Sequence, residues 1–125
     1  MGSDRSSRVI ERVIADIYAR LGEPITIDDM AHSATYSKSQ FVRIFKRAIG
    51  APPGQFVTSA RIQEAQRLLL TTSLSVTEIA ERVGYSSLGS FGTKFKSTVG
   101  LSPTAFRDTA NYTEAVSGTN RRKRP

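Results

Sequence analysis

Apolar residues recur along this chain at intervals of three and four, the spacing that lines one face of an α-helix. The first such run is stopped by Gly22 and Pro24. Its apolar positions are Val9, Ile10, Val13, Ile14, Ile17, Tyr18 and Leu21. The stretch from Gln55 to Thr71 contains neither glycine nor proline and predicts the longest helix. No segment alternates apolar and polar residues as a half-buried strand does, so the pattern predicts an all-α fold.

Capping motifs mark the starts of further helices. A Ser or Thr followed three residues later by an acidic residue or Gln can form a capping box, in which each side chain bonds the other residue's backbone N–H. This motif occurs at Thr26–Asp29, Ser37–Gln40 and Ser75–Glu78. With glycines as helix stops, the motifs predict helices over about 26–34, 37–49, 75–83 and 87–99, and a last one from about 102.

One pattern occurs twice. Residues 41–56 read FVRIFKRAIGAPPGQF and residues 91–106 read FGTKFKSTVGLSPTAF. With the capped helices before them, they define two units, 26–56 and 75–106. A short helix, a turn and a longer second helix is the geometry of helix-turn-helix DNA-binding domains, whose second helix lies in the major groove. Because two short helices also build ordinary small cores, the pattern alone leaves both interpretations open.

The repeats divide the chain into regions. We expect a disordered lead-in over 1–7, a first helix-turn-helix subdomain over 8–54, a linker helix over 55–71, a second subdomain over 72–109, and a disordered basic tail over 110–125.

The charge of the chain favours a polyanionic partner, with nucleic acid first. Its formal net charge is +7 at pH 7 and its sequence pI is about 10.3. Four of the positive charges lie at 121–124, so the remainder is only +3 and the distribution matters more than the total. The chain has no cysteine, which excludes disulfides and thiolate metal sites. No apolar run approaches the roughly 20 residues that cross a bilayer, so we expect no membrane partner.

The second helix of the first unit is predicted to carry a positive face opposite its core face. The predicted core face consists of Phe41, Ile44, Phe45, Ala48 and Ile49. No acidic residue occurs between Ser37 and Gln63, whereas a merely solvated face usually mixes charges. The residues opposite the core are Ser39, Val42, Arg43 and Lys46.

Within that face, Arg43 is the predicted base contact, because a guanidinium fits guanine O6 and N7. Ser39 and Val42 are predicted to touch base edges as well. Phosphate contacts set the register of a protein on DNA without specifying sequence, and the cations predicted to make them are Lys38, Lys46, Arg47 and Arg61.

The second helix of the other unit presents fewer side chains. Its outward stripe is Gly89, Gly92, Thr93 and Lys96. Each interior glycine costs a helix about 1 kcal/mol relative to alanine. One interpretation is close approach of the helix backbone to DNA, with Ser90 and Lys96 on phosphates. The other is a mainly structural unit, and the sequence leaves both open.

Enzymatic chemistry has little basis in this sequence. His32 is the only histidine, and no nucleophile motif or phosphate-binding glycine loop is present. We therefore expect no catalytic residues, no metal and no cofactor. The alternative to a DNA-binding regulator is a helical protein-interaction or output module with weak or nonspecific DNA affinity, in which changing Arg43 has little effect.

Several motifs together resemble the AraC/XylS family of transcription regulators. The resemblance covers about residues 9–108 and includes the central Arg61-x-x-x-Ala65-x-x-Leu68-Leu69 segment. Its signature residues here are Gly84-Tyr85-Ser86-Ser87, Phe91-x-x-x-Phe95-Lys96, Gly100-x-Ser102-Pro103 and Phe106-Arg107.

The resemblance implies two helix-turn-helix subdomains joined by a central helix, with both second helices in successive major grooves of a bacterial promoter. It implies a cytoplasmic regulator that usually activates through RNA polymerase. The base-contacting positions it implies are Ser39, Val42 and Arg43 in the first unit and Leu88, Gly89 and Thr93 in the second. Members often carry Arg or Gln at the latter positions, and this chain carries neither.

Most members attach this region to an effector-binding or dimerisation domain. Nothing in the 125 residues corresponds to one. The sequence is therefore expected to be either a minimal regulator or the output domain of a longer protein, and the short polar lead-in favours the second.

Overall fold

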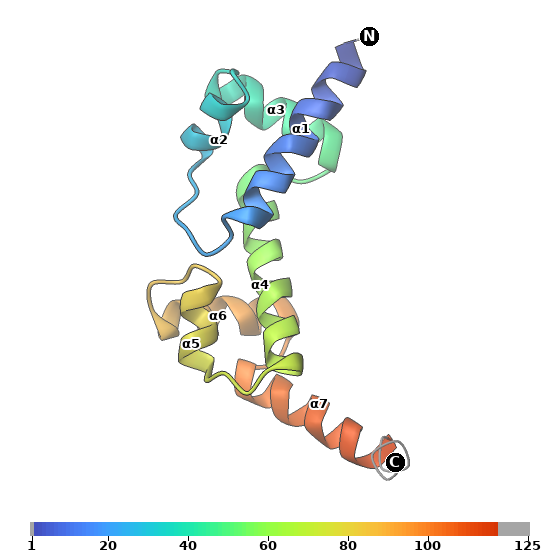
Figure 1. The fold of residues 1–125 in the computed structure, drawn as a ribbon, viewed down its shortest axis with the longest axis vertical. Helices are drawn as coiled ribbons and strands as arrows, with labels where there is room; N and C mark the ends of the chain where they lie inside the picture. Colours follow the sequence, from blue (N-terminus) through green and yellow to red (C-terminus); the bar gives the residue numbers. More distant parts are fainter. Residues whose placement is uncertain (1, 118–125) are drawn as a thin grey trace. The chain divides into compact units, whose positions relative to one another are not determined.

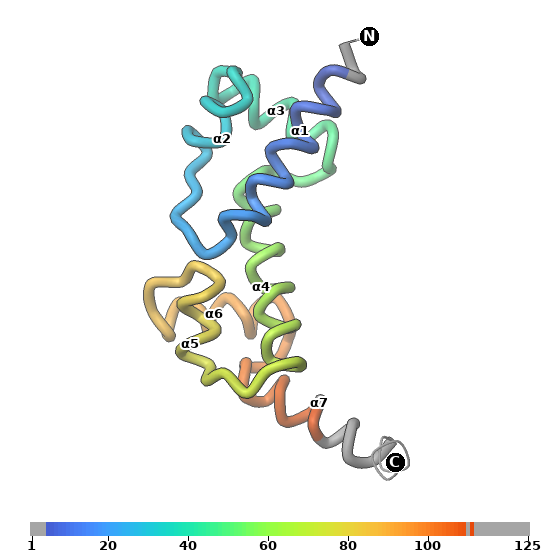
Figure 2. Tube along the Cα trace, viewed as in Figure 1, coloured from blue at the N-terminus to red at the C-terminus, as the bar shows by residue number. Residues whose placement is uncertain are grey.

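The computed structural model describes residues 2–117, and within them the fold is all-α, as predicted (Figure 1). The path of the chain can be followed in Figure 2. The helices are α1 (Gly2–Ala19), α2 (Ile27–Ser33), α3 (Lys38–Ile49), α4 (Pro53–Thr71), α5 (Val76–Arg82), α6 (Leu88–Val99) and α7 (Pro103–Ser117).

The two outermost helices are longer than the sequence predicts. α1 begins at Gly2, inside the segment expected to be a disordered lead-in, and α7 continues to Ser117, beyond the expected start of the tail at residue 110. Neither extension has a full apolar face, so neither could be recognised from periodicity. Once a helix is nucleated, each added residue costs little. The basic run at 121–124 lies outside the described residues.

The chain forms two compact units, residues 1–61 and 62–125, with the boundary inside α4. Each unit has its own buried core, built from a first helix, the short helix and the second helix. In the first unit the buried core residues are Ile10, Val13, Ile17, Leu21, Met30, Ala31, Ala34, Phe41, Phe45, Val57 and Ala60. In the second they are Ile62, Ala65, Leu68, Leu69, Ile79, Ala80, Val83, Phe91 and Phe95.

The repeated phenylalanines form the same aromatic stack in both units. In the first unit the ring centroids of Phe41 and Phe45 lie 5.7 Å apart, and those of Phe45 and Phe56 lie 5.5 Å apart. The corresponding distances in the second unit, along 91, 95 and 106, are both 5.6 Å. The tilted and edge-on arrangements are those that aromatic pairs prefer. The sequence repeat is thus a repeat of core packing.

The predicted capping residues start α2, α3 and α5. Thr26 Oγ1 accepts a hydrogen bond from the Asp29 backbone N–H at 3.0 Å. Both halves of the box form at Ser37–Gln40 and at Ser75–Glu78. Ser75 donates hydrogen bonds to the carboxylate of Glu78, and these lower the pKa of Glu78. These caps fix where each short helix begins.

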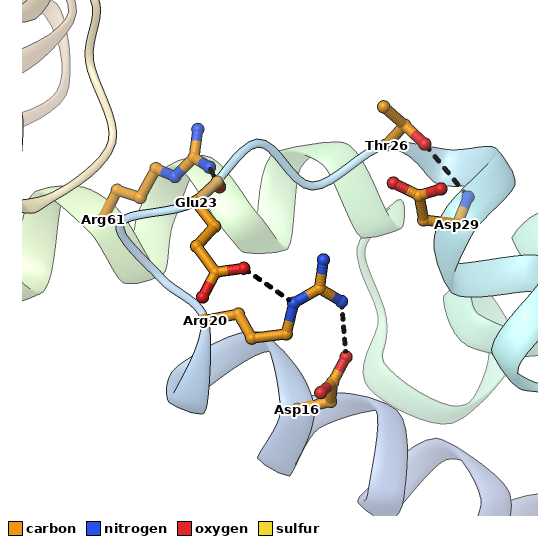
Figure 3. A network of polar contacts seen from close by, with 6 residues as sticks. All are labelled: Asp16, Arg20, Glu23, Thr26, Asp29 and Arg61. Carbon is orange, nitrogen blue, oxygen red and sulfur yellow. Dashed lines mark hydrogen bonds and ion pairs between the residues drawn. The ribbon is translucent and has the colours of Figure 1, made fainter.

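In each unit, one arginine side chain donates hydrogen bonds to two backbone carbonyls at or just after the end of a long helix. The Arg61 guanidinium donates to the carbonyl oxygen of Leu21 at 3.1 Å and to that of Glu23 at 2.8 Å, and Figure 3 draws the contact with Glu23. In the second unit, Arg107 donates to the carbonyl oxygens of Leu69 at 3.1 Å and Thr72 at 3.0 Å. Leu69 lies in the last turn of α4, where carbonyls lack intrahelical donors, and the other three acceptors follow a helix end, so each arginine satisfies two carbonyls at a helix terminus or in the turn after it.

The turn between the short helix and the second helix follows one plan in both units. The backbone N–H of Tyr36 donates to Ala31 O, and that of Tyr85 donates to Ala80 O. The preceding residue adopts a positive φ, 59° at Thr35 and 96° at Gly84. A β-branched residue is rare in this left-handed conformation. The first unit therefore holds Thr35 in a strained conformation that glycine adopts freely.

We expect Thr35→Gly to raise the free energy of unfolding by about 0.5–1 kcal/mol. The left-handed conformation costs a non-glycine residue roughly 1–2 kcal/mol. Glycine removes this cost but loses about 0.5–1 kcal/mol of stability, because it has more conformational entropy in the unfolded chain. Urea denaturation followed by circular dichroism measures the change. Gly84→Ala is the matched control at the equivalent position and should lower the same quantity by about 1 kcal/mol. A destabilised Thr35→Gly variant would contradict the argument.

Candidate nucleic-acid interface

α3 is held so that its polar face points away from the core. Ser37 caps its start, and Gly50, at φ 92°, ends it. Ala48 and Ile49, predicted for the core face, are exposed, whereas Phe41 and Phe45 have no exposed surface and Ile44 packs against the same core. Because a helix turns about 100° per residue, burial of these positions fixes the direction in which the opposite side chains project.

The structure brings five predicted site residues together on that opposite side. One shallow hollow is lined by Lys38, Ser39, Val42, Arg43 and Lys46. Val42 is half-buried, and the others are exposed. Arg47, also exposed, follows Lys46 along the helix. One half-buried valine, one serine hydroxyl and four cations therefore share one helix.

Most of these cations are free to bind an external anion. Lys38 Nζ lies 3.9 Å from Asp28 Oδ1, a long contact between two exposed groups that contributes little. The side chains of Arg43, Lys46 and Arg47 form no ion pair or hydrogen bond with any residue that the structure describes. In contrast, Arg20 and Arg67 elsewhere are paired with neighbouring carboxylates. α3 therefore concentrates unneutralised positive charge.

α6 is built on the same frame, with different surface chemistry. Ser87 caps it, Gly100 ends it, and Phe91 and Phe95 are fully buried. The predicted base contacts Gly89 and Thr93 are exposed, and Leu88 is 48% exposed. Lys96 is exposed as well. A second hollow on this helix is lined by Tyr85, Gly89, Ser90, Thr93, Lys94 and Ser97.

Lys94 and Ser97 line this hollow, although neither was predicted as a site residue. Lys94 aligns with Ile44 of the first unit, a core-facing position. In the structure it is exposed and borders the hollow. The exchange of a half-buried apolar residue for a lysine between aligned repeats was the signal that could have identified it.

The two glycines of α6 are not required by the packing of the protein. A methyl group built at Gly89 or Gly92 meets no atom within 4 Å. Their φ angles are not of the left-handed kind. The fold would therefore accept alanine at both positions, and alanine has the higher helix propensity.

Arg61 differs from the other predicted phosphate contacts. It is half-buried, and its guanidinium is engaged by the two carbonyls described above (Figure 3). This geometry gives Arg61 a role in holding the turn that follows α1, and its predicted phosphate contact stays a prediction. The other candidate residues lie on α3 in the first unit and on α6 in the second.

Residues 2–117 meet the requirements of neither a metal site nor a membrane-spanning helix. His32 lies exposed near the end of α2. No group of three or more acidic or histidine side chains in the described part of the chain could hold a metal ion. None of the described helices has both the length and the apolar character that crossing a bilayer demands.

Comparisons with known proteins identify the family to which this fold belongs. Residues 30–109, more than half of the chain, match a family model described as a helix-turn-helix domain. The chain is 34% identical over 101 residues to the transcriptional activator AarP of Providencia stuartii, covering 81% of this chain and 75% of AarP. Other curated relatives are longer, and the chain spans only 27% and 40% of two of them.

Solved structures show the same fold. The DNA-binding domain of AdpA, crystallised with a target DNA, superposes with a TM-score of 0.82 at 31% identity, over 85% of this chain and 96% of that one. An AraC-type regulator from Chromobacterium violaceum gives a TM-score of 0.77 at 27% identity, over 84% and 94% of the two chains. With its repeated units and matched family model, the chain belongs to the AraC/XylS family of helix-turn-helix transcription regulators.

Proposed function

We propose that this chain binds a specific site on double-stranded promoter DNA and regulates transcription there, acting as an activator. The observation that carries the proposal is the outer face of α3, where four basic side chains occur without an acidic residue on the same helix. AarP, a transcriptional activator, and AdpA, whose DNA-binding domain was crystallised with its target, support it by similarity.

In this proposal α3 enters the major groove and is the main base-contacting element. Arg43 lines the hollow together with Ser39 and Val42. Arginine pairs with guanine through two hydrogen bonds, and an apolar side chain suits the methyl group of thymine. Lys38, Lys46 and Arg47 neutralise phosphates on either side.

α6 occupies the next major groove in the proposal and contributes less to sequence preference. Gly89 and Thr93 face the bases, and the exposed apolar surface of Leu88 suits a thymine methyl group. Ser90 and Lys96 contact phosphates. The subdomains proposed for these two helices are residues 8–54 and 72–109, with 55–71 linking them.

The remaining assignments follow from the family. We assign no catalytic activity and no cofactor to the chain, because the family consists of DNA-binding regulators. We propose that it works in the cytoplasm and that RNA polymerase is its protein partner at the promoter. In a longer protein, an effector-binding or dimerisation domain would be attached to this region.

The proposal is tested by selecting from a pool of randomised duplexes at near-physiological salt and footprinting the enriched sequence. Two motifs separated by about one helical turn, roughly 10–10.5 base pairs, are expected if both helices contact bases. One motif beside a protected but unspecified flank would assign base recognition to α3 alone. No enrichment would favour the protein-interaction module instead.

We expect Arg43→Ala to lower affinity for the selected site by about 1–3 kcal/mol and to relax preference at one base pair, the effect of losing a bidentate guanine contact. Titrations with the selected duplex and with single-base variants of it measure both effects. An equal loss on random duplex would show that Arg43 binds only phosphate.

The matched control for Arg43→Ala is Lys46→Ala, which removes one charge from the same hollow. It is expected to weaken binding to all duplexes alike and to reduce the salt dependence of log K by about one unit. A preference change at a particular base pair would contradict a phosphate role for Lys46.

We expect Gly89→Ala and Gly92→Ala to stabilise the protein and weaken its DNA binding. Each should raise the free energy of unfolding by up to about 1 kcal/mol, because alanine favours the helix and meets no neighbour. The added methyl groups would separate α6 from the DNA. The control is Thr98→Ala, which favours the same helix away from the proposed DNA face. Unchanged affinity in both glycine variants would mean that α6 does not approach DNA closely.

A further inference from the structure

The exposed polar residues of α6 are divided between two sides of the helix. Lys94 and Lys96 are two positions apart, and a helix turns about 100° per residue, so the two side chains leave the axis about 200° apart. Consistent with this, Lys94 lines the hollow on α6, whereas Lys96 is not part of its lining. Thr93 lies between them on the outward face, opposite Phe91 and Phe95.

The hollow beside Lys94 suits an anion. Lys94 is exposed and forms no ion pair with any residue described in the structure. The hydroxyl groups of Ser90 and Thr93 line the same hollow and make no hydrogen bond within the described residues. Ser97 donates its hydroxyl to Lys94 O at 3.0 Å and keeps only its acceptor capacity. One cation and two hydroxyl groups that make no hydrogen bond within the described residues therefore belong to residues lining the same hollow.

The first unit carries no cation at the position of Lys94. The position aligned with Lys94 is Ile44, which is half-buried and packs against the core. The hollow on α3 is instead bordered by Lys46, the residue aligned with Lys96. On α3 the charge on that side is carried by Arg47, the residue aligned with Ser97, so the two helices place this cation at different positions.

The dimensions of DNA indicate what these two sides would meet. The major groove is about 12 Å wide, and an α-helix with side chains is about 10–12 Å across. A helix lying in the groove therefore faces the phosphate ridge of a different strand on each side. This reasoning rests on the proposed DNA-binding function.

We propose that α6 is a backbone clamp: Lys94, with the Ser90 hydroxyl, binds phosphates of one DNA strand, while Lys96 binds phosphates of the other. The paired contacts centre the helix in the groove and hold its glycines toward the bases. The second unit then supplies register and affinity, while α3 supplies most of the sequence preference.

The test is the salt dependence of binding to the selected duplex and to a random duplex, measured by fluorescence anisotropy for wild type, Lys94→Gln and Lys96→Gln. Each variant is expected to lower the slope of log K against log salt concentration by about one on both duplexes. Arg12→Gln is the matched control, since it removes one exposed, unpaired charge from α1, and should leave the slope unchanged.

Phosphate-ethylation interference then identifies the strands. Lys94→Gln is expected to lose interference at phosphates of one strand and Lys96→Gln at phosphates of the other. If Lys94→Gln behaves like Arg12→Gln, or if both lysines map to one strand, the clamp is overturned while DNA binding stands. If wild type shows no salt-dependent binding to either duplex, both the clamp and the proposed function fail.

Discussion

Burial of two phenylalanines one helical turn apart is the constraint on which each unit depends. Phe41 and Phe45 in α3, and Phe91 and Phe95 in α6, are fully enclosed, and each pair is extended by a third ring from the following helix. Two large side chains separated by four positions fix the rotation of a helix about its axis as well as its position. The outward face is thereby determined, and its residues can vary without altering the core.

This separation explains why much of the fold and the α3 face could be predicted from the sequence. The phenylalanine spacing identified the buried sides, and the serine caps at 37 and 75 identified the starts of α3 and α5. The parts that could not be predicted depend on contacts that leave no periodic pattern. The hydrogen bonds of Arg61 go to backbone carbonyls, which are the same for every residue type. Lys94 was not predicted as a site residue, and the residue aligned with it, Ile44, packs against the core.

The two units share one fold, but each carries its destabilising residues in a different place. The first holds a β-branched residue, Thr35, in a left-handed turn where the second has Gly84. The second carries two helix-weakening glycines in α6, where the first has Ser39 and Val42. Neither glycine relieves a steric conflict within the protein. Positions that lower stability without a structural reason are common where a surface serves binding, because natural proteins retain stability costs that function requires.

The distribution of arginine and lysine distinguishes structural cations from those available for binding. Arg61 and Arg107 each satisfy two carbonyls, a task that suits the planar guanidinium with its several fixed donors. Arg20 and Arg67 are neutralised by adjacent carboxylates. The cations left over on α3 and α6 therefore matter more than the net charge of +7 suggests. On α3 the unpaired charges share a helix with the buried phenylalanines, so the packing that forms the core also sets the direction in which the proposed DNA contacts project.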